Sequence, residues 1–461
     1  MNIPMTLTKI TLTVAACAAV SLTARHAQAE APFRLITLDP GHFHAALVQK
    51  SMIPGVSPEV HIYAPEGPDL DLHLERVRAF NTREDNPTQW DLKVHTGPDF
   101  LQKMLAEKPG NIVVLAGNNR DKTRYILESV KAGLHVLSDK PMAIDPEGLK
   151  MLEEAYRIAG EKNLLMLDIM TERFEITTML QKEFSRFPGV FGELDKGTPD
   201  SPSVTKESVH HFSKLVNDKP LQRPPWFFDP LQQGEAIVDV TTHLVDLVQW
   251  ECFPGEIIKD SDVKMISARS WNTDLTKEQF AKVTKMDSWP EYLKPMVGAD
   301  GILRTPANGE FTYSLRGVHA KVSVLWNFEA PPGTADTHDS LMRGTKCSLH
   351  IRQGKDQGYK PVLYIEPHAT TDAASWNRAL DKAAWEVTAK FPGVYLKGSG
   401  GRYEVVIPDH YKKGHEAHFA QVAERFLGFL KNGGSPEWEV PNTLAKYRTI
   451  MQAYKMSRNS K

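Results

Sequence analysis

The sequence has little cysteine and almost no excess charge. Only three cysteines occur in 461 residues, at positions 17, 252 and 347. This is too few for a disulfide framework or a thiolate metal site. We expect Cys252 and Cys347 to be buried thiols, with a bond between them as the alternative. A formal net charge of −2 leaves no basic face to neutralise phosphates, which argues against a nucleic-acid-binding protein.

Long apolar runs are absent beyond the N-terminus, so no membrane-spanning helix is expected. Near the N-terminus, Lys9 precedes a mostly apolar stretch over residues 10–24, and Ala27-Gln28-Ala29 forms a small-x-small cleavage site. This layout is typical of a secretory signal peptide. We expect cleavage after Ala29 and a periplasmic or secreted protein. Lipidation of Cys17 and a retained anchor are the alternatives.

Between residues 34 and 168, short apolar runs alternate with helical patterns. The clearest helix has Asp145 as N-cap and Pro146 at its first position, and it stops at Gly160. Such alternation favours a parallel sheet with helices on both faces, which binds ligands at the carboxyl ends of its strands. The predicted buried strands are 35–38, 60–63, 112–115, 135–137 and 164–167.

After residue 168 the pattern changes. Alternating segments at 311–315, 318–326 and 346–351 predict an antiparallel sheet with one wet face. The predicted helices of this part are 172–187, 235–250, 415–431 and 441–458, whereas residues 354–401 show no clean period. The expected fold is an α/β Rossmann-like parallel-sheet domain followed by an α+β domain with a large, mostly antiparallel sheet. The expected division is a signal peptide (1–29), a dinucleotide-binding domain (30–168) and a substrate and oligomerisation domain (169–461).

The loop after the first predicted strand reads Asp39-Pro40-Gly41-His42-Phe43-His44. It lies where a dinucleotide-binding fold carries G-x-G-x-x-G, whose glycines let the pyrophosphate approach. Only the middle glycine is present here, and the Asp39 carboxylate would repel a pyrophosphate. We interpret Gly41, His42 and Phe43 as part of a cofactor loop. The alternatives are a metal site of Asp39, His42 and His44, or a structural turn.

Glu66 follows the second predicted strand. An acid at this place would hold the ribose hydroxyls of NAD and repel the additional phosphate of NADP. An ordinary solvated loop carboxylate accounts for it equally well.

Two further blocks resemble the Gfo/Idh/MocA (glucose–fructose oxidoreductase/inositol dehydrogenase) family. Gly117-Asn118-Asn119 and Asp139-Lys140-Pro141 stand where that family has T-P-N and E-K-P. The second block begins with Trp226-Phe227-Phe228-Asp229-Pro230 and continues through Asp239, His243 and Asp246, resembling W-r-x-D-P followed by D-x-G-x-H-x-x-D. Both blocks stand in the family's order and spacing. Asp139 replaces a glutamate, and Thr241-Thr242 replaces the usual G-x.

The resemblance implies a nicotinamide cofactor, NAD, and a catalytic centre of three residues. Lys140 would lie at the nicotinamide and the substrate hydroxyl, His243 would be the general acid/base, and Asp239 would orient His243 or the substrate. At 100° per residue, Asp239, His243 and Asp246 share one face of a helix. An imidazole that titrates near neutrality suits acid/base catalysis; a structural Asp–His pair is the alternative. The remaining cofactor residues would be Gly117, Asn118, Asn119, Asp139 and Pro141.

A set of polar and aromatic residues is expected on the substrate side, where a tryptophan beside charged groups suits a sugar ring. Arg173 matches the family's n-R-f at the domain junction. The expected substrate residues are Arg173, His210, His211, Arg223, Trp226 and Asp246, and no metal ligand is assigned.

The sequence therefore predicts an exported NAD-dependent oxidoreductase that acts on a sugar or glycoside and forms a homo-oligomer. Free NAD is scarce outside the cytoplasm, so the cofactor is expected to stay tightly bound. One alternative is an NAD-dependent glycosidase that oxidises the sugar transiently and eliminates the aglycone. The others are a non-catalytic sugar-binding protein and a metal-dependent lyase or hydratase.

Overall fold

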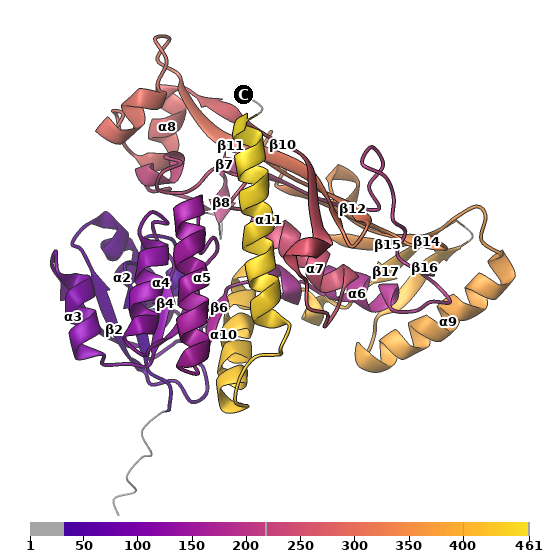
Figure 1. Ribbon diagram of the computed structural model, residues 1–461, viewed down its shortest axis with the longest axis horizontal. Coiled ribbons are helices and arrows are strands. Elements are labelled where there is room, and N and C mark those ends of the chain that lie inside the picture. The colour runs from indigo at the N-terminus through magenta and orange to yellow at the C-terminus, as the bar shows by residue number, and fades with distance from the viewer. Residues whose placement is uncertain (1–31, 217–218, 400, 460–461) are drawn as a thin grey trace, which may run out of the picture.

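A computed structural model describes residues 32–216, 219–399 and 401–459 (Figure 1). The predicted signal peptide and Cys17 lie outside these described residues. Two sheets organise the molecule. A smaller parallel sheet is built by the first part of the chain and a larger mixed sheet by the second. Within the described part, no helix has the length and apolar character needed to cross a membrane.

The first sheet has six strands in the order β3-β2-β1-β4-β5-β6, and all its neighbours pair in parallel. The central strands β1 and β4 are buried at every position and almost entirely apolar because helices cover both faces of the sheet. This confirms the Rossmann-like part of the predicted fold. The strands are β1 (Leu35–Leu38), β2 (Glu59–Ala64), β3 (Asp91–Thr96), β4 (Ile112–Leu115), β5 (His135–Ser138) and β6 (Met166–Asp168).

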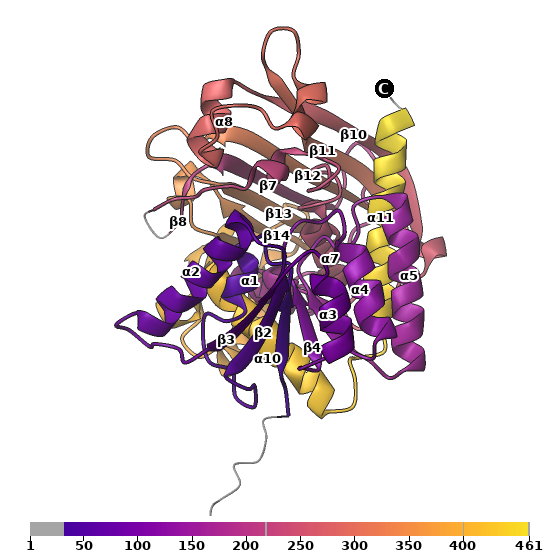
Figure 2. The ribbon, with the colours of Figure 1, turned by 90° about the vertical axis from the view of Figure 1, so that its left-hand side faces the viewer.

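Five helices connect these strands (Figure 2). The Asp145 side chain accepts the backbone N–H of Gly148 at 2.7 Å, as expected of an N-cap, and Pro146 is the first helical residue. The helices are α1 (His44–Leu47), α2 (Pro68–Thr82), α3 (Phe100–Glu107), α4 (Lys122–Lys131) and α5 (Pro146–Glu161).

The second sheet has nine strands in the order β10-β11-β12-β7-β13-β14-β15-β17-β16. Only β12 and β7 pair in parallel among the described pairs of this sheet, so it is mixed and mostly antiparallel, as predicted. A two-stranded ribbon of β8 (Leu215–Val216) and β9 (Lys219–Pro220) lies outside it. The nine strands are β7 (Val204–Ser213), β10 (Val263–Leu275), β11 (Leu303–Leu315), β12 (Val318–Glu329), β13 (Thr337–Arg343), β14 (Cys347–Gln353), β15 (Val362–Pro367), β16 (Tyr395–Ser399) and β17 (Arg402–Val406).

Helices α6 and α7 cover one face of this sheet, since their apolar residues share a core with its strands. Cys252 and Cys347 are free thiols. The α-helices of this part are α6 (Ile176–Ser185), α7 (Thr241–Cys252), α8 (Lys277–Thr284), α9 (Ala373–Lys390), α10 (His415–Lys431) and α11 (Glu439–Asn459). The 3-10 helices are η1 (Thr171–Phe174), η2 (Pro225–Phe228), η3 (Asp260–Asp262), η4 (Glu291–Met296), η5 (Lys355–Gln357) and η6 (Asp409–Tyr411).

The two closing helices return to the parallel sheet. Phe419 and Phe426 of α10 belong to the core on one side of that sheet, and Tyr447 of α11 belongs to the core on the other. Ile450 and Met451 of α11 belong to the core of the large sheet. Helix α11 therefore joins both parts, and it runs between them in Figure 1.

Candidate active site

A cavity of about 160 Å³ lies at the carboxyl edge of the parallel sheet. The loops after β1, β4 and β5 form one wall, the turn before α7 together with β7 and β12 forms another, and α10 contributes His415. Its lining residues are His42, Phe43, His44, Gly117, Asn119, Asp139, Lys140, Glu172, His210, Lys214, Leu221, Arg223, Phe227, Gln233, Asp239, Val240, His243, Trp326 and His415. The three predicted catalytic residues are therefore all at one cavity.

Lys140 and Asp239 form an ion pair in this cavity. The backbone N–H of Asp139 donates to the Leu115 carbonyl at 2.7 Å, which continues the β4–β5 ladder and carries Lys140 to the sheet edge. Lys140 Nζ donates to Asp239 Oδ1 at 2.6 Å, and Gln233 Nε2 donates to Asp239 Oδ2 at 2.9 Å. Burial would lower the pKa of Lys140, but the carboxylates of Asp239 and Asp139 outweigh burial and hold that pKa above its usual value. Lys140 is therefore a protonated hydrogen-bond donor.

His243 lies in the first turn of α7 and is buried. Its Nδ1 has no hydrogen-bond partner. Burial, reinforced by the Lys140 ammonium, lowers the pKa of His243 to about 4, so the ring is neutral near pH 7. Among the described residues, no hydrogen bond joins Asp239 to His243, and the two oxygens of that carboxylate accept from Lys140 and Gln233.

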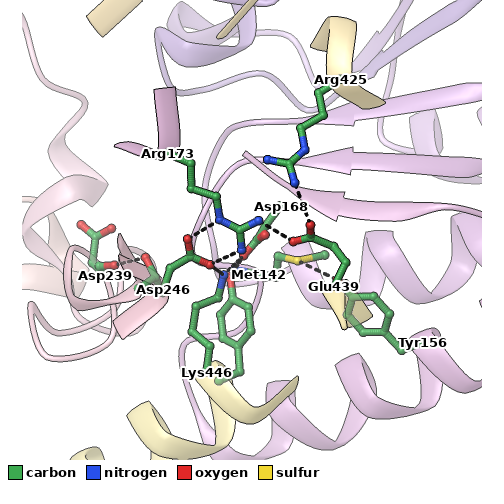
Figure 3. A network of polar contacts seen from close by, with 11 residues as sticks. Met142, Tyr156, Asp168, Arg173, Asp239, Asp246, Arg425, Glu439 and Lys446 are labelled. Atoms are coloured by element: carbon green, nitrogen blue, oxygen red, sulfur yellow. Dashed lines mark hydrogen bonds and ion pairs between the residues drawn. The ribbon is translucent and has the colours of Figure 1, made fainter. Parts of the chain in front are cut away.

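Helix α7 begins at Thr241, six residues after the predicted start at residue 235, so Asp239 stands in a turn and not on the helix. Asp246 points away from the cavity into a buried network of ion pairs (Figure 3). Arg173 Nε and Nη2 donate to Asp246 at 2.6 and 2.7 Å, and Arg173 Nη1 donates to Glu439 Oε1 at 2.7 Å. Lys446 Nζ donates hydrogen bonds to Asp246 Oδ1 and to Asp168 Oδ2. Arg173 and Asp246, predicted to bind substrate, are thus engaged with protein groups and do not line the cavity.

The loop after β1 departs from a standard dinucleotide loop. The N–H groups of Gly41 and His42 both donate to the Ala116 carbonyl, at 3.2 and 3.1 Å, so neither is free for a phosphate. Asp39 Oδ2 accepts the Tyr125 hydroxyl at 3.1 Å, and burial raises the pKa of Asp39 to about 6. Asp39 is not among the residues that line the cavity.

The alternative metal trio of Asp39, His42 and His44 is not assembled. His44 Nδ1 lies 2.9 Å and His42 Nδ1 lies 3.9 Å from Asp139 Oδ2, so the carboxylate beside these histidines comes from the loop after β5.

The two loop glycines allow close packing. A Cβ on Gly117 would stand 2.2 Å from the Asp39 carbonyl oxygen, so only glycine fits where the β1 and β4 loops meet. A Cβ on Gly41 would be 2.9 Å from Asp69 Oδ2 and 3.2 Å from the Trp226 ring. Trp226 Nε1 donates to Asp69 Oδ2 at 2.7 Å. Trp226, predicted to meet the substrate, therefore covers the β1 loop and does not line the cavity.

The other predicted cofactor residues lie in different surroundings. Asn118 Nδ2 donates to Gln232 Oε1 at 2.8 Å and Asn119 Nδ2 donates to the Gln233 carbonyl at 2.7 Å, which ties the β4 loop to the turn before α7. Pro141 follows Lys140 through a cis peptide bond. Glu66 is exposed just after β2, accepts the Thr96 hydroxyl at 3.3 Å and does not line the cavity.

On the substrate side, His210 and Arg223 line the cavity and both lie against Trp326. The His210 ring stacks on Trp326 with centroids 4.8 Å apart, and the Arg223 guanidinium lies 5.0 Å from the Trp326 ring centre. His210 Nε2 is buried without a hydrogen-bond partner. His211 faces Asp336 instead, with Nδ1 2.8 Å from Oδ1, and does not line the cavity.

Two arginines flank the β1 loop. Arg76 of α2 and Arg223 line a smaller hollow against Gly41, His42 and Phe43. Among the described residues, neither guanidinium forms an ion pair with a carboxylate. Burial lowers the pKa of Arg223 to about 10, so it is still charged at neutral pH. Guanidinium groups are strong phosphate donors, so these side chains could replace the loop N–H groups in holding a pyrophosphate.

Sequence reasoning missed several lining residues, above all Glu172 and His415. His415 Nδ1 lies 3.5 Å from Glu172 Oε1. Burial would raise the pKa of Glu172, but His415 and His243 outweigh burial and hold that pKa well below its usual range. His415 comes from α10, at the far end of the sequence, so no local motif could have indicated it. Trp326 also lines the cavity, but the sequence indicated it only as the last residue of the predicted strand 318–326.

Comparison with known proteins agrees with this fold. Residues 180–458 match the family described as "Putative oxidoreductase C terminal domain". The chain is 53% identical to a protein from Parabacteroides merdae ATCC 43184, described as a "putative oxidoreductase", whose crystal structure superposes with a TM-score of 0.92 over 94% of this chain and 99% of that one. It is 24% identical to D-glucoside 3-dehydrogenase of Escherichia coli (strain K12) over 218 residues, which are 47% of this chain and about half (53%) of that relative.

Two more distant structures share the fold. The 3-ketoreductase KijD10 from Actinomadura kijaniata, in complex with NADP and TDP-benzene, is 14% identical with a TM-score of 0.57 and covers 92% of this chain and 97% of its own. Levoglucosan dehydrogenase, in complex with NADH and levoglucosan, is 14% identical with a TM-score of 0.58, covering 93% and 98%.

Proposed function

Because the chain belongs to the family defined by this oxidoreductase C-terminal domain and is an oxidoreductase of the Gfo/Idh/MocA type, we propose that it transfers hydride between a sugar or glycoside and a nicotinamide cofactor. The observation that carries the proposal is the Lys140–Asp239 pair, which stands beside the neutral His243 in one cavity at the carboxyl edge of a dinucleotide-type sheet.

The two basic residues would divide the proton chemistry. The nicotinamide, when bound, accepts or returns a hydride at the sugar carbon. His243, neutral and with an unpartnered Nδ1, suits the group that takes the hydroxyl proton. Lys140, kept protonated by Asp239, suits the group that donates a hydrogen bond to the same sugar oxygen. Trp326, with His210 stacked on it, supplies an aromatic surface for a sugar ring.

The cofactor-binding groups follow from the charges around the β1 loop. Arg76 and Arg223 would hold the pyrophosphate where the glycines and free N–H groups are lacking. Glu66, at the end of β2, would hold the ribose hydroxyls and favour NAD over NADP. Residues 30–168, together with Arg223, would bind the cofactor, and residues 169–461 would bind the sugar and form the homo-oligomer.

Calorimetry on nucleotide-free protein tests whether NAD and NADP bind. An assay of NADH formation with a panel of β- and α-glucosides then tests the reaction. We expect binding of NAD that is tighter than that of NADP, and NADH formation with at least one glucoside. Absence of binding of both nucleotides would contradict the proposal.

Export and a retained cofactor complete the proposal. The apolar stretch 10–24 and Ala27-Gln28-Ala29 support cleavage before Glu30. The intact mass of the native protein tests both points, since it shows the first residue, any lipid on Cys17 and any nucleotide that co-purifies. A diacylated N-terminus would contradict the cleavage after Ala29.

A redox-neutral glycoside cleavage is the second candidate, favoured by the Glu172–His415 pair. This is a second acid–base pair at the same cavity, 3.5 Å apart. Elimination from a transiently oxidised sugar needs a base for an acidified C–H and an acid for the leaving oxygen, and two pairs could share these tasks. Aglycone release without net NADH formation would favour this candidate over the first.

A further inference from the structure

Three potential metal ligands converge at one side of the cavity. His42 and His44 come from the loop after β1, and Asp139 comes from the loop after β5. One ligand atom from each residue can be chosen so that all three lie within 4.8 Å of one another. His44 Nδ1 is 2.9 Å and His42 Nδ1 is 3.9 Å from Asp139 Oδ2.

These separations suit a bound ion. In a tetrahedral zinc site, bonds of about 2.0 to 2.2 Å place neighbouring ligand atoms roughly 3.3 to 3.6 Å apart. The distances of 2.9 and 3.9 Å to Asp139 Oδ2 lie on either side of that range, and the separations within the trio extend up to 4.8 Å. Side-chain rotations that bring the three ligand atoms closer together would complete the site. His42 Nδ1 also accepts the His44 backbone N–H at 3.3 Å, a weak contact that a metal bond would replace.

The ligands are held in place and open on one side. His44 and Asp139 are 8% and 4% exposed, and the backbone N–H of Asp139 is fixed on Leu115. The neighbouring ammonium groups are engaged elsewhere, because Lys140 pairs with Asp239 and Lys122 donates to the backbone carbonyls of Asp139 and Pro141. The Asp139 carboxylate is therefore left to the two histidines.

We propose that His42, His44 and Asp139 form a binding site for a divalent transition-metal ion, with zinc as the preferred ion. The open coordination position of this ion would face the cavity. Two imidazoles and a carboxylate suit zinc, and three protein ligands with an open position are typical of a catalytic zinc site. An ion there would stand in the same cavity as Lys140 and could take a sugar oxygen as its fourth ligand. This inference goes beyond the proposed function and does not depend on it.

Zinc binding to the full chain tests the inference. Chelator-treated protein is titrated with zinc chloride in a calorimeter, and metal content is measured after gel filtration. We expect one zinc per chain, with an affinity that falls at least about tenfold in His44→Ala and in Asp139→Asn. The control is His95→Ala, because that histidine lies on β3 outside the cavity. It should bind zinc like the natural chain.

Binding that is absent, or equal in His44→Ala, Asp139→Asn and His95→Ala, would overturn the proposal and leave His44 and Asp139 as a simple hydrogen-bonded pair. Circular dichroism checks that the variants fold. Should both site variants fail to fold, diffraction at the zinc absorption edge from natural-chain crystals decides instead, since a zinc peak must lie between these three side chains. NAD affinity is measured on the same samples, so that a failure of the zinc proposal can be distinguished from a failure of the oxidoreductase proposal.

Discussion

The Lys140 ammonium and the Asp239 carboxylate meet at 2.6 Å although 99 positions separate them in the chain. The lysine stands at the carboxyl edge of β5 and the aspartate in the turn before α7, and their side chains are 11% and 7% exposed. A buried pair is costly to desolvate, so its retention at the lining of a cavity favours a role toward a ligand over a role in stability.

Removing this pair should abolish most activity. We expect Lys140→Met and Asp239→Asn each to lower kcat by roughly 10²–10⁴-fold, because in the proposed mechanism Lys140 donates to the reacting oxygen and Asp239 helps to keep it protonated. The double variant should be much less than multiplicatively worse, since both changes remove one unit. Steady-state kinetics check this, with the exposed Lys150→Met as control. Multiplicative losses would show that the two residues act separately.

The pH dependence of turnover should identify His243 as the base. Its pKa is lowered to about 4, so the ring carries no proton over the neutral range and becomes protonated only on acidification. We expect kcat/KM to depend little on this group from about pH 7 down to about pH 5 and to fall toward pH 4. His243→Ala should lose roughly 10²–10⁴-fold in turnover and keep its cofactor affinity. A variant with full turnover and a lower melting temperature would make His243 structural.

Local sequence patterns predicted the parallel sheet well because its central strands are buried on both faces. The run 35–38 is apolar except for Thr37, is buried throughout and matches β1. The edge strand β3 (Asp91–Thr96) escaped prediction because it alternates polar and apolar residues and is largely exposed. Residues 354–401 form η5, β15, α9 and β16, so two strands flank a helix and the segment has no single period. Of its strand pairings, only that of β15 with β17 spans α9.

Some residues that sequence motifs indicated do line the cavity, whereas long-range contacts decide where others lie. Lys140 and His243 were placed by their motifs. Arg173 fitted a motif equally well, yet partners 73 and 266 positions away hold it in a buried network. His415 reaches the cavity only because α10 packs on the parallel sheet. Single-sequence reasoning has no access to such long-range contacts.

Arginine 76 should contribute to cofactor affinity and not to folding. It is half-buried, lies beside Gly41 and His42, and has no carboxylate ion pair among the described residues. Arg76→Gln should raise the Kd for NAD roughly 10-fold or more, the loss of a charge-assisted phosphate contact. Calorimetry measures this, and Arg78→Gln on the exposed side of the same helix is the control. Equal affinities in the two variants would remove Arg76 from the cofactor site.

Histidine 73 should make the protein less stable in acid. It is 2% exposed, neither ring nitrogen has a partner, and burial lowers its pKa to about 3. Because the folded pKa is below the unfolded value, the unfolded chain binds more protons and stability falls as pH drops below 6.5. The difference in unfolding free energy between His73→Phe and the natural chain should therefore shift in favour of the variant by about 2 kcal/mol when the pH falls from about 7.5 to about 5. Urea unfolding at both pH values checks this, and the exposed His410→Phe should show no such difference.

Lysine 446 should be essential for stability. Its ammonium is fully buried and donates to Asp168 Oδ2 at 2.7 Å and to Asp246 Oδ1 at 3.0 Å, in the network that joins α11 to β6 and α7 (Figure 3). Lys446→Met keeps a long, unbranched side chain but leaves Asp168 buried without its cation, because Arg173 pairs with Asp246 and Glu439. We expect a loss of about 3–5 kcal/mol in urea unfolding at neutral pH.

A second variant shows whether the orphaned charge causes this loss. Burial raises the pKa of Asp168 against the effect of Lys446, so the carboxylate is costly once the ammonium is gone. Adding Asp168→Asn to Lys446→Met should therefore recover part of the lost stability, since a neutral amide replaces the unpaired charge. The exposed Lys455→Met on the same helix should change stability by no more than about 0.5 kcal/mol. A double variant that is less stable than Lys446→Met alone would mean that Lys446 acts through packing and not through its charge.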